Sequence, residues 1–529
     1  MKWNIIETDP SGIAEKYHTG KLMAKLLAVS DLDEENIRSL LAGDRQLHTS
    51  GARCVRECCQ RILLAMHRRE KVFTGGDYDA DGVCATAIMK RTLDKLGITN
   101  GYYIPDRFRE GYGLSAATVR LAKEKGYSLI ITVDNGVRAH EALKTARELG
   151  IDVIVTDHHR IEEEIEADFV VHPDYMEDEY QYLCGAGVAL EISRYLTGAD
   201  DELTALAAVA SIGDVMPLWK ETRRIVLAGM DILKRRVPRP LDAMLRPGSQ
   251  VNWTSIAFQI VPKLNSVGRM NDISNVNTLV PFLLSHDEQV ISRYAAQLEL
   301  VNDRRKELSD IQTKTAEEKI DDSRILLVYD ESFHEGICGL VAGRLANAHQ
   351  KPALVFARAN DLVKGSGRSI PGFDMFSFFS DFDELAAFGG HEQAVGLSVK
   401  AEDFDSFCAH VTQKFSTYDL ADEEPQETAA AIRADEITMD EIMSLSDAEP
   451  MPKELVPYFA VTDVQVLSVR ETQKVIRYNV ACASGPLEAV LYRRKGIVPP
   501  EDPSCMIGKL SLNRWRSNVT MTLEIEDLF

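Results

Sequence analysis

The sequence predicts a multidomain α/β protein that ends in a small all-β module, and three observations lead to this fold class. Between residues 71 and 286, short apolar runs alternate with helical segments, which is typical of βαβ units and a mostly parallel sheet. A long polar segment of helical periodicity, without Gly or Pro, follows from residue 287 to 319. From residue 459 onward, apolar and polar residues alternate with period two.

The chain of 529 residues is too long for a single hydrophobic core, so we expect several domains. Because the pattern changes at a few places, it also suggests where they begin and end. The expected parts are an N-terminal helical segment (1–70), a first α/β unit (71–286), a connecting helix (287–320), a second α/β unit (321–420), an acidic linker (421–456) and the β-module (457–529).

Composition narrows the class of protein. Apolar residues make up 45% and charged residues 27%, as in an ordinary soluble globular protein. No apolar run is long enough to cross a membrane and the N-terminus lacks a signal-peptide core, so we expect a cytoplasmic protein. Of nine scattered cysteines, only Cys54, Cys58 and Cys59 lie close together, which favours buried thiols over zinc or disulfides.

The formal net charge of −22 argues against a general nucleic-acid binder, which usually has a basic surface. It still allows a protein whose basic residues gather in one channel. Carboxylates that bind metal ions also add to the acidic count, although the metal neutralises them in use.

Within the first unit, the predicted strands lie at residues 72–73, 101–104, 129–133, 153–155 and 169–171. Helical periodicity covers residues 34–41 and 52–69 before them, residues 139–149 between them, and most of residues 186–245 after them. A second series of strands and helices begins at residue 324 and extends to about residue 399.

Three carboxylates follow the first predicted strand, at Asp77, Asp79 and Asp81. Open α/β sheets bind ligands at the carboxyl ends of their strands. Closely spaced carboxylates stay ionised together only beside a cation, and hard oxygen ligands suit Mg²⁺ or Mn²⁺. An EF-hand calcium loop is the first alternative, but its twelfth position requires Glu and here is Ile88. A solvated acidic turn is the second.

Later segments carry further candidate ligands. The strand at 129–133 leads into Asp134, the strand at 153–155 leads into Asp157, His158 and His159, and residues 210–213 lead into Asp214. A single Asp in such a place is more often a helix cap or a turn residue than a ligand. Parallel strands bring their carboxyl ends together, so we expect these side chains to converge in one crevice.

These motifs resemble those of the DHH phosphoesterase superfamily: DYDADG at 77–82, DNG at 134–136 and DHH at 157–159. The chain is most similar to the RecJ branch, the single-stranded-DNA exonucleases. Further segments resemble that branch in the same order: IPDR and EGYG within 104–113, LCGAGVA at 183–189, GDVMPL at 213–218, NSVGRM at 265–270, and HEG, GSGRS and GGH at 334–336, 365–369 and 389–391.

The resemblance implies a DHH catalytic domain, a DHH-associated second α/β domain and a C-terminal OB-fold β-barrel. It implies metal ligands at Asp79, Asp81, Asp134, His158 and Asp214, with Asp77 and His159 among or beside them. His159, Asp134 and Asp81 would be catalytic. We expect two Mn²⁺ or Mg²⁺ ions about 3.5–4 Å apart, which would activate a water and stabilise the leaving oxygen. For His159, the sequence leaves two roles open: positioning the scissile phosphate or protonating a departing group.

The resemblance also implies a grip on the 5′-phosphate and the nearby backbone, through Arg107, Arg269, Arg344, Ser366, Arg368 and His391. A Gly-Ser-Gly turn exposes backbone N–H groups, and Arg binds phosphate oxygens bidentately. In the β-module, Arg493, Arg494, Arg514, Trp515 and Arg516 are candidates for contact with single-stranded DNA, although Trp515 is equally compatible with a core position.

Three segments depart from the family pattern: Asp106 in the Pro-Asn-Arg motif, His172 in the Asn-Pro motif, and residues 451–459 in place of a Gly- and Asn-containing segment before the OB fold. The first two leave the ligands intact. The third leaves open how the β-module docks.

The resemblance therefore implies a metal-dependent 5′→3′ exonuclease that hydrolyses single-stranded DNA to 5′-mononucleotides in DNA repair or recombination. Single-stranded-DNA-binding protein and a RecQ-like helicase would be its partners, with no membrane. Two alternatives remain: a short-oligonucleotide or dinucleotide phosphodiesterase of the same superfamily, and a non-catalytic Cdc45-like replication scaffold. The β-module argues against the first, and the full set of acids and histidines argues against the second.

Overall fold

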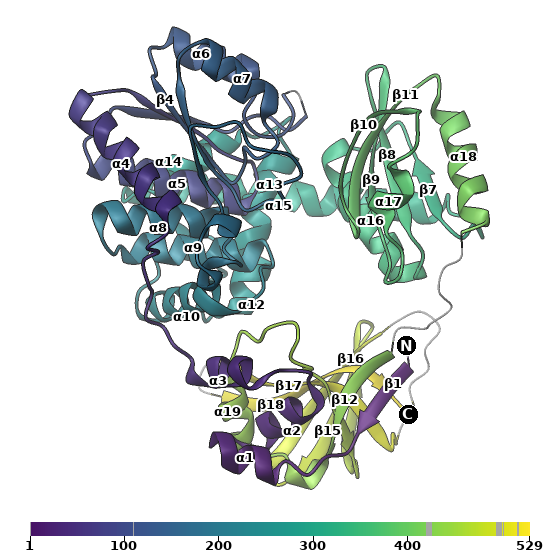
Figure 1. Ribbon diagram of the computed structural model, residues 1–529. Helices are drawn as coiled ribbons and strands as arrows, with labels where there is room; N and C mark the ends of the chain where they lie inside the picture. Colours follow the sequence, from purple (N-terminus) through teal and green to yellow (C-terminus); the bar gives the residue numbers. More distant parts are fainter. Residues whose placement is uncertain (1, 109, 419–425, 494–499, 501, 516–517) are drawn as a thin grey trace.

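The computed structural model (Figure 1) describes residues 2–108, 110–418, 426–493, 500, 502–515 and 518–529. It confirms the predicted fold class of two α/β units joined by a long helix and followed by a β-module. No helix in these ranges is both long and apolar enough to cross a bilayer.

A fully parallel five-stranded sheet, in the order β3-β2-β4-β5-β6, forms the centre of the first unit. Helices cover both faces, which explains why its strands are short continuous apolar runs. The strands are β2 (Val72–Gly75), β3 (Asn100–Tyr103), β4 (Leu129–Val133), β5 (Asp152–Thr156) and β6 (Phe169–Val171).

Two hydrophobic cores lie on the two faces of this sheet. Leu129 and Ile131 pack with α4, α5 and α8 on one face, whereas Ile130 and Val153 pack with α6 and α7 on the other. These helices are α4 (Arg53–Arg68), α5 (Ala80–Lys95), α6 (Ala116–Glu124), α7 (His140–Glu148) and α8 (Gly185–Thr197).

A helical layer completes the unit on the α8 side and shares its core. It comprises α9 (Asp201–Gly213), α10 (Lys220–Arg235), α11 (Arg239–Asp242), α12 (Trp253–Ser255), the π-helix η3 (Ile256–Ile260), α13 (Val261–Arg269) and α14 (Leu279–Leu283). Short 3₁₀ turns are η1 (Pro173–Tyr175), η2 (Asp178–Tyr180) and η4 (Val276–Thr278).

Helix α15 (Glu288–Glu317) connects the two α/β units. The second unit has a five-stranded sheet in the order β10-β11-β9-β8-β7, in which only β7 and β8 are parallel. Helix α16 covers one face, and α17 and α18 cover the other. The elements are β7 (Leu326–Tyr329), α16 (Glu335–His349), β8 (Ala353–Ala359), β9 (Leu362–Arg368), α17 (Met375–Phe379), β10 (Leu385–His391), β11 (Ala394–Lys400) and α18 (Phe404–Ser416).

The β-module contains an eight-stranded sheet in the order β1-β12-β13-β17-β18-β16-β15-β14, consistent with an OB-like fold. The sheet is larger than the five strands of a minimal OB fold, and three of its strand pairs are parallel. Its strands are β1 (Lys2–Ile6), β12 (Gln426–Arg433), β13 (Phe459–Thr462), β14 (Val466–Glu471), β15 (Val475–Cys482), β16 (Gly485–Tyr492), β17 (Cys505–Trp515) and β18 (Asn518–Leu528).

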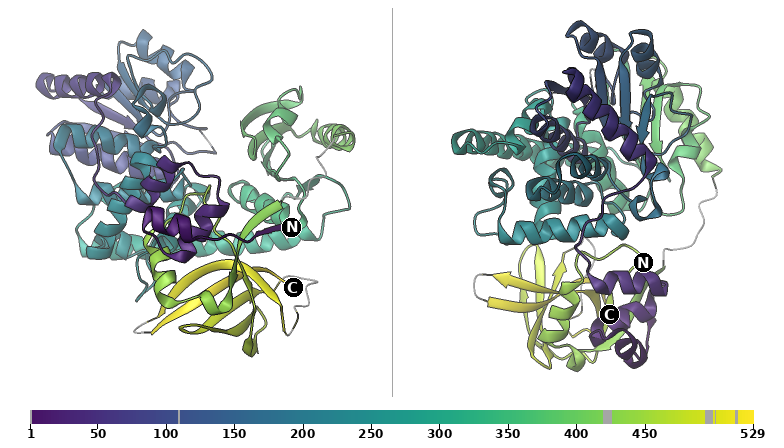
Figure 2. Two further views of the ribbon diagram at one scale, coloured as in Figure 1. Left: turned by 60° about the horizontal axis from the view of Figure 1, so that its bottom comes forward. Right: turned by 60° about the vertical axis from the view of Figure 1, so that its left-hand side comes forward.

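The N-terminal 70 residues do not form one helical segment. Strand β1 pairs with β12 in parallel, and Leu22, Leu26 and Leu40 pack into the core of the β-module. Only α4 belongs to the catalytic unit. The three helices that join the β-module are α1 (Ser11–Tyr17), α2 (Lys21–Val29) and α3 (Glu34–Ala42). Figures 1 and 2 show this N-terminal part beside the last strands of the chain.

The predicted acidic linker is also structured. Residues 426–456 contain β12, the 3₁₀ turn η5 (Ala434–Glu436) and α19 (Met439–Asp447), whereas residues 421–425 lie outside the described part. Strand β12 is rich in Ala, which has low β-propensity, so its local sequence does not predict a strand. Pairing with β1 and β13 on its two sides stabilises it as one.

Three side chains of the catalytic unit hold residues 448–456, which we call the docking segment. Arg223 on α10 donates to the carbonyl oxygens of Ala448 and Pro450 at 2.8 and 2.7 Å. The indole N–H groups of Trp219 and Trp253 donate to Glu454 and Glu449 at 2.9 and 3.2 Å. The docking segment, which overlaps the segment that departs from the family pattern (451–459), therefore attaches the β-module beneath α10 and α12 (Figure 1).

Candidate metal centre and substrate site

The carboxyl ends of β2, β4 and β5 place Asp77, Asp134 and His158 at one edge of the parallel sheet. Asp79 caps α5 by accepting hydrogen bonds from the backbone N–H groups of Asp81 and Gly82. Asp214 reaches the same place from the C-terminus of α9, so it follows a helix and not a strand.

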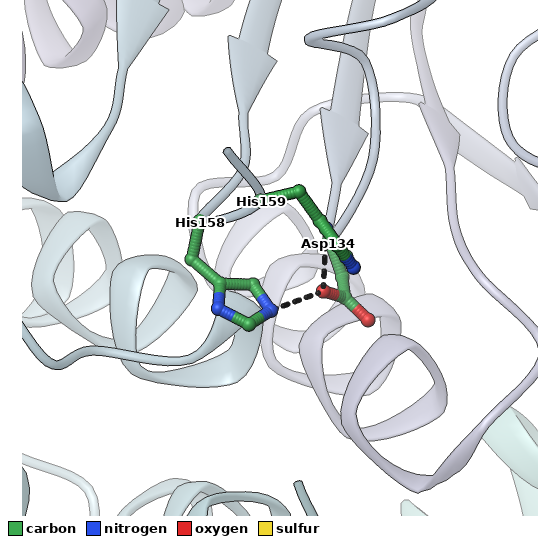
Figure 3. A group of neighbouring side chains, drawn as sticks. All are labelled: Asp134, His158 and His159. Carbon is green, nitrogen blue, oxygen red and sulfur yellow. Dashed lines mark ion pairs between the residues drawn. The ribbon is translucent and has the colours of Figure 1, made fainter. Parts of the chain in front are cut away.

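The side chains converge closely. His158 Nε2 lies 3.2 Å from Asp134 Oδ1, 3.6 Å from Asp81 Oδ2 and 3.6 Å from Asp214 Oδ2. In Figure 3, dashed lines join His158 and His159 to the same oxygen of Asp134. Three overlapping groups each have ligand atoms within 4.8 Å of one another: Asp134, His158 and His159; Asp81, His158 and Asp214; Asp77, Asp79 and Asp134. We call Asp77, Asp79, Asp81, Asp134 and Asp214 the acid cluster.

Two glycines make this convergence possible. A Cβ at Gly82 would lie 2.5 Å from the Cβ of Asp77, and one at Gly185 would lie 2.4 Å from the Cβ of Asp134. Gly185 begins α8, and its N–H and that of Ala186 donate to the two oxygens of Asp81 at 2.7 and 2.8 Å. The start of α8 therefore fixes Asp81, because helix N-termini favour anionic groups.

Asp134 has a positive φ of 61°, an uncommon conformation for a residue with a Cβ. The side-chain amide of its neighbour Asn135 donates to the carbonyl oxygens of Gly75 and Val133, and its oxygen accepts from the N–H of Leu114. These bonds tie the ends of β2 and β4 together and hold Asp134 in place. Backbone strain of this kind is concentrated at functional sites.

The electrostatics of the acid cluster fit a divalent cation. Burial, and then repulsion by neighbouring carboxylates, raises the pKa of Asp77 and Asp134 well above the usual value and that of Asp214 to about 8. One oxygen each of Asp77 and Asp134 is buried with no hydrogen-bond partner among the described residues. Burial also lowers the pKa of His158, which keeps its imidazole neutral, the form that binds metals.

His159 has a different environment from His158. Its Nδ1 lies 2.7 Å from Asp157 Oδ1. Burial opposes protonation, but the hydrogen bond and charge of Asp157 outweigh it and raise the pKa of His159 to about 9. Burial likewise opposes ionisation of Asp157, yet His159 lowers its pKa to about 2. His159 is therefore cationic at neutral pH and lies at the rim of the acid cluster.

Tyr112 also contacts His159. Its hydroxyl donates to the carbonyl oxygen of Asp134 at 3.0 Å and lies 3.3 Å from His159 Nδ1. The sequence motif contains Tyr112 and Asp157, but only the fold shows that both orient His159. The sequence signal that could have identified Asp157 as the orienting residue is its position directly before the two histidines.

Basic side chains gather beside the acid cluster. The guanidinium of Arg107 lies 4.9 Å from the ring centre of Tyr78, next to Asp77 and Asp79 in the chain. Burial, and then the charge of Arg107, lowers the pKa of Arg269 to about 10 and also lowers that of Arg368. We call Arg107, Arg269 and Arg368 the arginine cluster. Among the residues that the structure describes, no carboxylate lies within 4.0 Å of its nitrogen atoms.

The arginine cluster combines the two α/β units. Arg107 and Arg269 belong to the first, whereas Arg368 ends β9 of the second, and a Cβ at Gly339 would lie 3.1 Å from Arg368 and 3.5 Å from the hydroxyl of Ser366. A cavity of about 270 Å³ adjoins the cluster, with Tyr78 and Arg107 in its wall. Anionic groups of a substrate would complete this set of unpaired cations.

The other predicted substrate residues lie farther out. Arg344 pairs with Asp310 on α15 at 2.7 Å. His391 ends β10, and both His391 and Arg368 lie opposite Ala394, so they are two strands apart, about 10 Å. Arg305 on α15, whose charge reaches Arg269, was not among the predicted residues. Nothing in a long polar helix distinguishes such an arginine from a surface residue.

Only some of the residues predicted to contact DNA in the β-module lie in the described part of the chain. Arg493 pairs with Glu471, and Arg514 and Trp515 belong to β17. Arg494 and Arg516 lie outside the described residues. The role of these five residues in DNA contact stays a prediction.

Two family models match the two α/β units of the chain. A model described as "DHH family, N-terminal domain" matches residues 71–213, and the model of the DHHA1 domain matches residues 322–417. The parallel sheet with Asp and His at its strand ends thus defines a protein of the DHH class.

Individual relatives narrow this class. Over its whole length the chain is 32% identical to the single-stranded-DNA-specific exonuclease RecJ of Bacillus subtilis (strain 168), of which it covers 70%. It is 29% identical to that of Escherichia coli (strain K12), with 90% of each chain covered. The chain therefore belongs to the RecJ family. A crystal structure of RecJ with Mn²⁺ from Thermus thermophilus has the same fold, with a TM-score of 0.84 at 22% identity, covering 100% of this chain and 79% of that one.

Proposed function

We propose that this protein is a metal-dependent exonuclease that hydrolyses single-stranded DNA from its 5′ end and releases 5′-mononucleotides. The observation that carries the proposal is the position of an unpaired arginine cluster directly beside a buried acid cluster. The arginine cluster suits the phosphates at the end of a nucleic acid, and the acid cluster suits divalent cations. Membership of the RecJ family supports the same substrate.

Asp77, Asp79, Asp81, Asp134, His158 and Asp214 would hold Mn²⁺ or Mg²⁺, and two ions are expected from the number of ligands. When bound, such ions activate a water for attack on phosphorus and stabilise charge on the leaving oxygen. RecJ from Thermus thermophilus has been crystallised in complex with Mn²⁺ and in complex with Mg²⁺, which supports the same choice of metals here.

His159 would bind the scissile phosphate. Its imidazolium, kept charged by Asp157, lies next to the carboxylates without being buried among them. A cation in this place attracts the phosphate during binding and stabilises the added negative charge in the transition state. Asp157 and Tyr112 orient the ring, and Asp134 and Asp81 would contribute to catalysis with His159 by holding the metal ions.

The arginine cluster would bind the 5′-phosphate. Ser366 and Arg368 come from the second unit, Arg107 and Arg269 from the first, and Arg344 and His391 lie outside them for the neighbouring backbone. Because the grip is made by both units, a terminal phosphate would fix the strand end relative to the acid cluster. As part of the same proposal, the enzyme acts in the cytoplasm, with single-stranded-DNA-binding protein and a RecQ-like helicase as partners.

The test is a time course on a 5′-phosphorylated single strand labelled at its 3′ end, in Mn²⁺ and in EDTA. We expect mononucleotides in Mn²⁺ only, while the label stays on steadily shortening strands. Faster hydrolysis of a dinucleotide than of the long strand would favour the dinucleotide phosphodiesterase. No hydrolysis of either by folded protein would favour the scaffold.

A further inference from the structure

Helix α13 runs alongside both clusters and orders them in space. At its C-terminal end, Arg269 belongs to the arginine cluster. One turn earlier, the side-chain oxygen of Asn265 accepts a hydrogen bond from the N–H of Ala80. Ala80 lies in the chain between two members of the acid cluster, Asp79 and Asp81. At its N-terminal end, Val261 lies against Gly213, where an added Cβ would come within 3.1 Å of its side chain, and Gly213 precedes Asp214.

This order gives the strand a direction. With its 5′-phosphate at Arg269 and its scissile phosphate at the acid cluster, the rest of the strand leaves past Asp214, toward the N-terminal end of α13. Helix η3 lies there, immediately before Val261. The docking segment of the β-module lies on the same side, because Trp253 and Trp219 hold Glu449 and Glu454.

Lys453 lies between those two anchored glutamates. Its side chain is exposed, and no hydrogen bond or ion pair to any described residue engages it. Its neighbour Glu454 is bonded to Trp219, which follows Asp214 by five residues, so this part of the docking segment lies on the Asp214 side of the catalytic unit. In a chain with a net charge of −22, an exposed lysine on the same side as a carboxylate cluster, with no ion pair to a described residue, is suited to bind a phosphate that passes between them.

Phe258 lies on η3 with 72% of its surface exposed. It follows Trp253 by five residues, and Trp253, on the preceding helix α12, is bound to the docking segment. Gln259, next to it, accepts from the N–H of Arg246 at 2.9 Å, which braces η3 against the preceding loop. Exposed aromatic rings beside basic residues are the platforms on which single-stranded bases stack.

We propose that Lys453 and Phe258 form a subsite for the single strand on the 3′ side of the cleaved bond, with Lys453 on a phosphate and Phe258 under a base. The proposal rests on the proposed exonuclease function for the direction of the strand. It assigns to the docking segment a contact with substrate in addition to its contact with the catalytic unit.

The test compares Lys453→Gln and Phe258→Ala with two matched controls. Lys123→Gln removes an exposed lysine of α6 that likewise lacks a carboxylate partner among the described residues, and Tyr195→Ala removes an aromatic ring of α8 that is 40% exposed. Each variant is assayed in Mn²⁺ on a 5′-phosphorylated strand of about 16 nucleotides and on a 5′-phosphorylated dinucleotide. Binding of the long strand is measured in EDTA over a range of salt concentrations.

We expect Phe258→Ala to raise KM and Kd for the long strand about tenfold. Lys453→Gln should raise them about threefold to tenfold and reduce the slope of log K against log salt by about 1. The loss on the long strand should exceed the loss on the dinucleotide, which does not reach the subsite, and the controls should match the parent protein.

Two results would overturn the subsite: variants that bind the long strand like the controls, or equal losses on both substrates, which would indicate an effect on the acid cluster itself. If the parent protein hydrolyses neither substrate, the proposed function fails. Binding in EDTA still decides whether Lys453 and Phe258 contact the strand.

Discussion

The acid cluster and the arginine cluster each gather side chains of like charge, yet they are built differently. The acid cluster lies within one unit. Any side chain in place of Gly82 or Gly185 would clash with Asp77 or Asp134, and Asp134 is held at a positive φ. The arginine cluster takes Arg107 and Arg269 from one unit and Arg368 from the other. The first is therefore preorganised for its ligand, and the second depends on how the two units are placed.

The contacts between the units support this difference. His334 lies 3.2 Å from Asp272, and Lys364 bonds both Glu335 and the carbonyl oxygen of Phe108, next to Arg107. A Cβ at Gly336 would lie 2.0 Å from the carbonyl oxygen of Arg269. The backbone that carries the arginines is thus in direct contact with the second unit, so substrate binding there also stabilises the arrangement of the units.

Removing a charge from the acid cluster should have the largest effect. Asp134→Asn should lower kcat by about 10³-fold or more, because it removes a ligand shared by two of the candidate metal groups. The same change should raise the melting temperature of the metal-free protein, since it removes one buried carboxylate that the neighbouring carboxylates repel. Activity and thermal unfolding in EDTA measure the two effects, with Asp303→Asn on α15 as a surface control. Retained activity would contradict the metal-centre hypothesis.

Removing a charge from the arginine cluster should affect substrate selection. Arg269→Gln should lower kcat/KM for a 5′-phosphorylated strand about tenfold to a hundredfold, the value of one or two charge-assisted hydrogen bonds. A 5′-hydroxyl strand should lose much less. Steady-state kinetics on both strands measure this, with Arg293→Gln on α15 for comparison. Equal losses on the two strands would show that the cluster does not bind the terminal phosphate.

The dependence of protein stability on pH provides a separate test of the acid cluster. The pKa of Asp214 is raised to about 8 in the folded metal-free protein. Since an unfolded carboxyl group titrates near pH 4, the folded state binds the extra proton between about pH 4 and pH 8. Stability of the metal-free protein should therefore fall as pH rises through this window, by about 2–4 °C in melting temperature for each kcal/mol lost.

Saturating Mn²⁺ should reverse this trend, because the metal binds the ionised carboxylates. In the metal-free protein, Asp214→Asn should flatten it. Differential scanning fluorimetry from pH 4 to pH 9, with EDTA or Mn²⁺, measures both effects. A metal-free protein whose stability is unchanged or rises over this window would refute the account of the acid cluster.

The smallest effect is expected for Arg305→Gln. Arg305 acts on Arg269 through its charge and is bonded to Asn302 on its own helix. We expect a threefold to fivefold rise in KM for the phosphorylated strand, from weakened long-range attraction. The rise should diminish as salt increases. An effect as large as that of Arg269→Gln would place Arg305 in direct contact with phosphate.

Sequence patterns predict the acid cluster well because its residues follow strands that are continuous apolar runs, and parallel strands must bring their ends together. Asp214 was expected in the same crevice, but its route into it, from the end of helix α9, could not be predicted, since nothing in the sequence shows that α9 ends beside the sheet. Arg305 could not be found, because its role depends on the position of one helix against two others. Strand β12 was missed because its Ala-rich sequence has low β-propensity and because one of its two partners, β1, is far away in the sequence.

Strand β1 pairs with β12, from Lys2 with Gln426 to Ile6 with Ala430, and the whole catalytic unit lies between them in the chain. A ribosome adds about 5–20 residues per second. Strand β1 and the apolar faces of α2 and α3 therefore remain unpaired while both α/β units are synthesised, because their partners emerge only afterwards. During that interval Leu22, Leu26 and Leu40 have no core to enter. These residues are thus translated before the catalytic unit but complete their folding after it, and nascent chains should depend on chaperones over this interval more than the catalytic unit alone does.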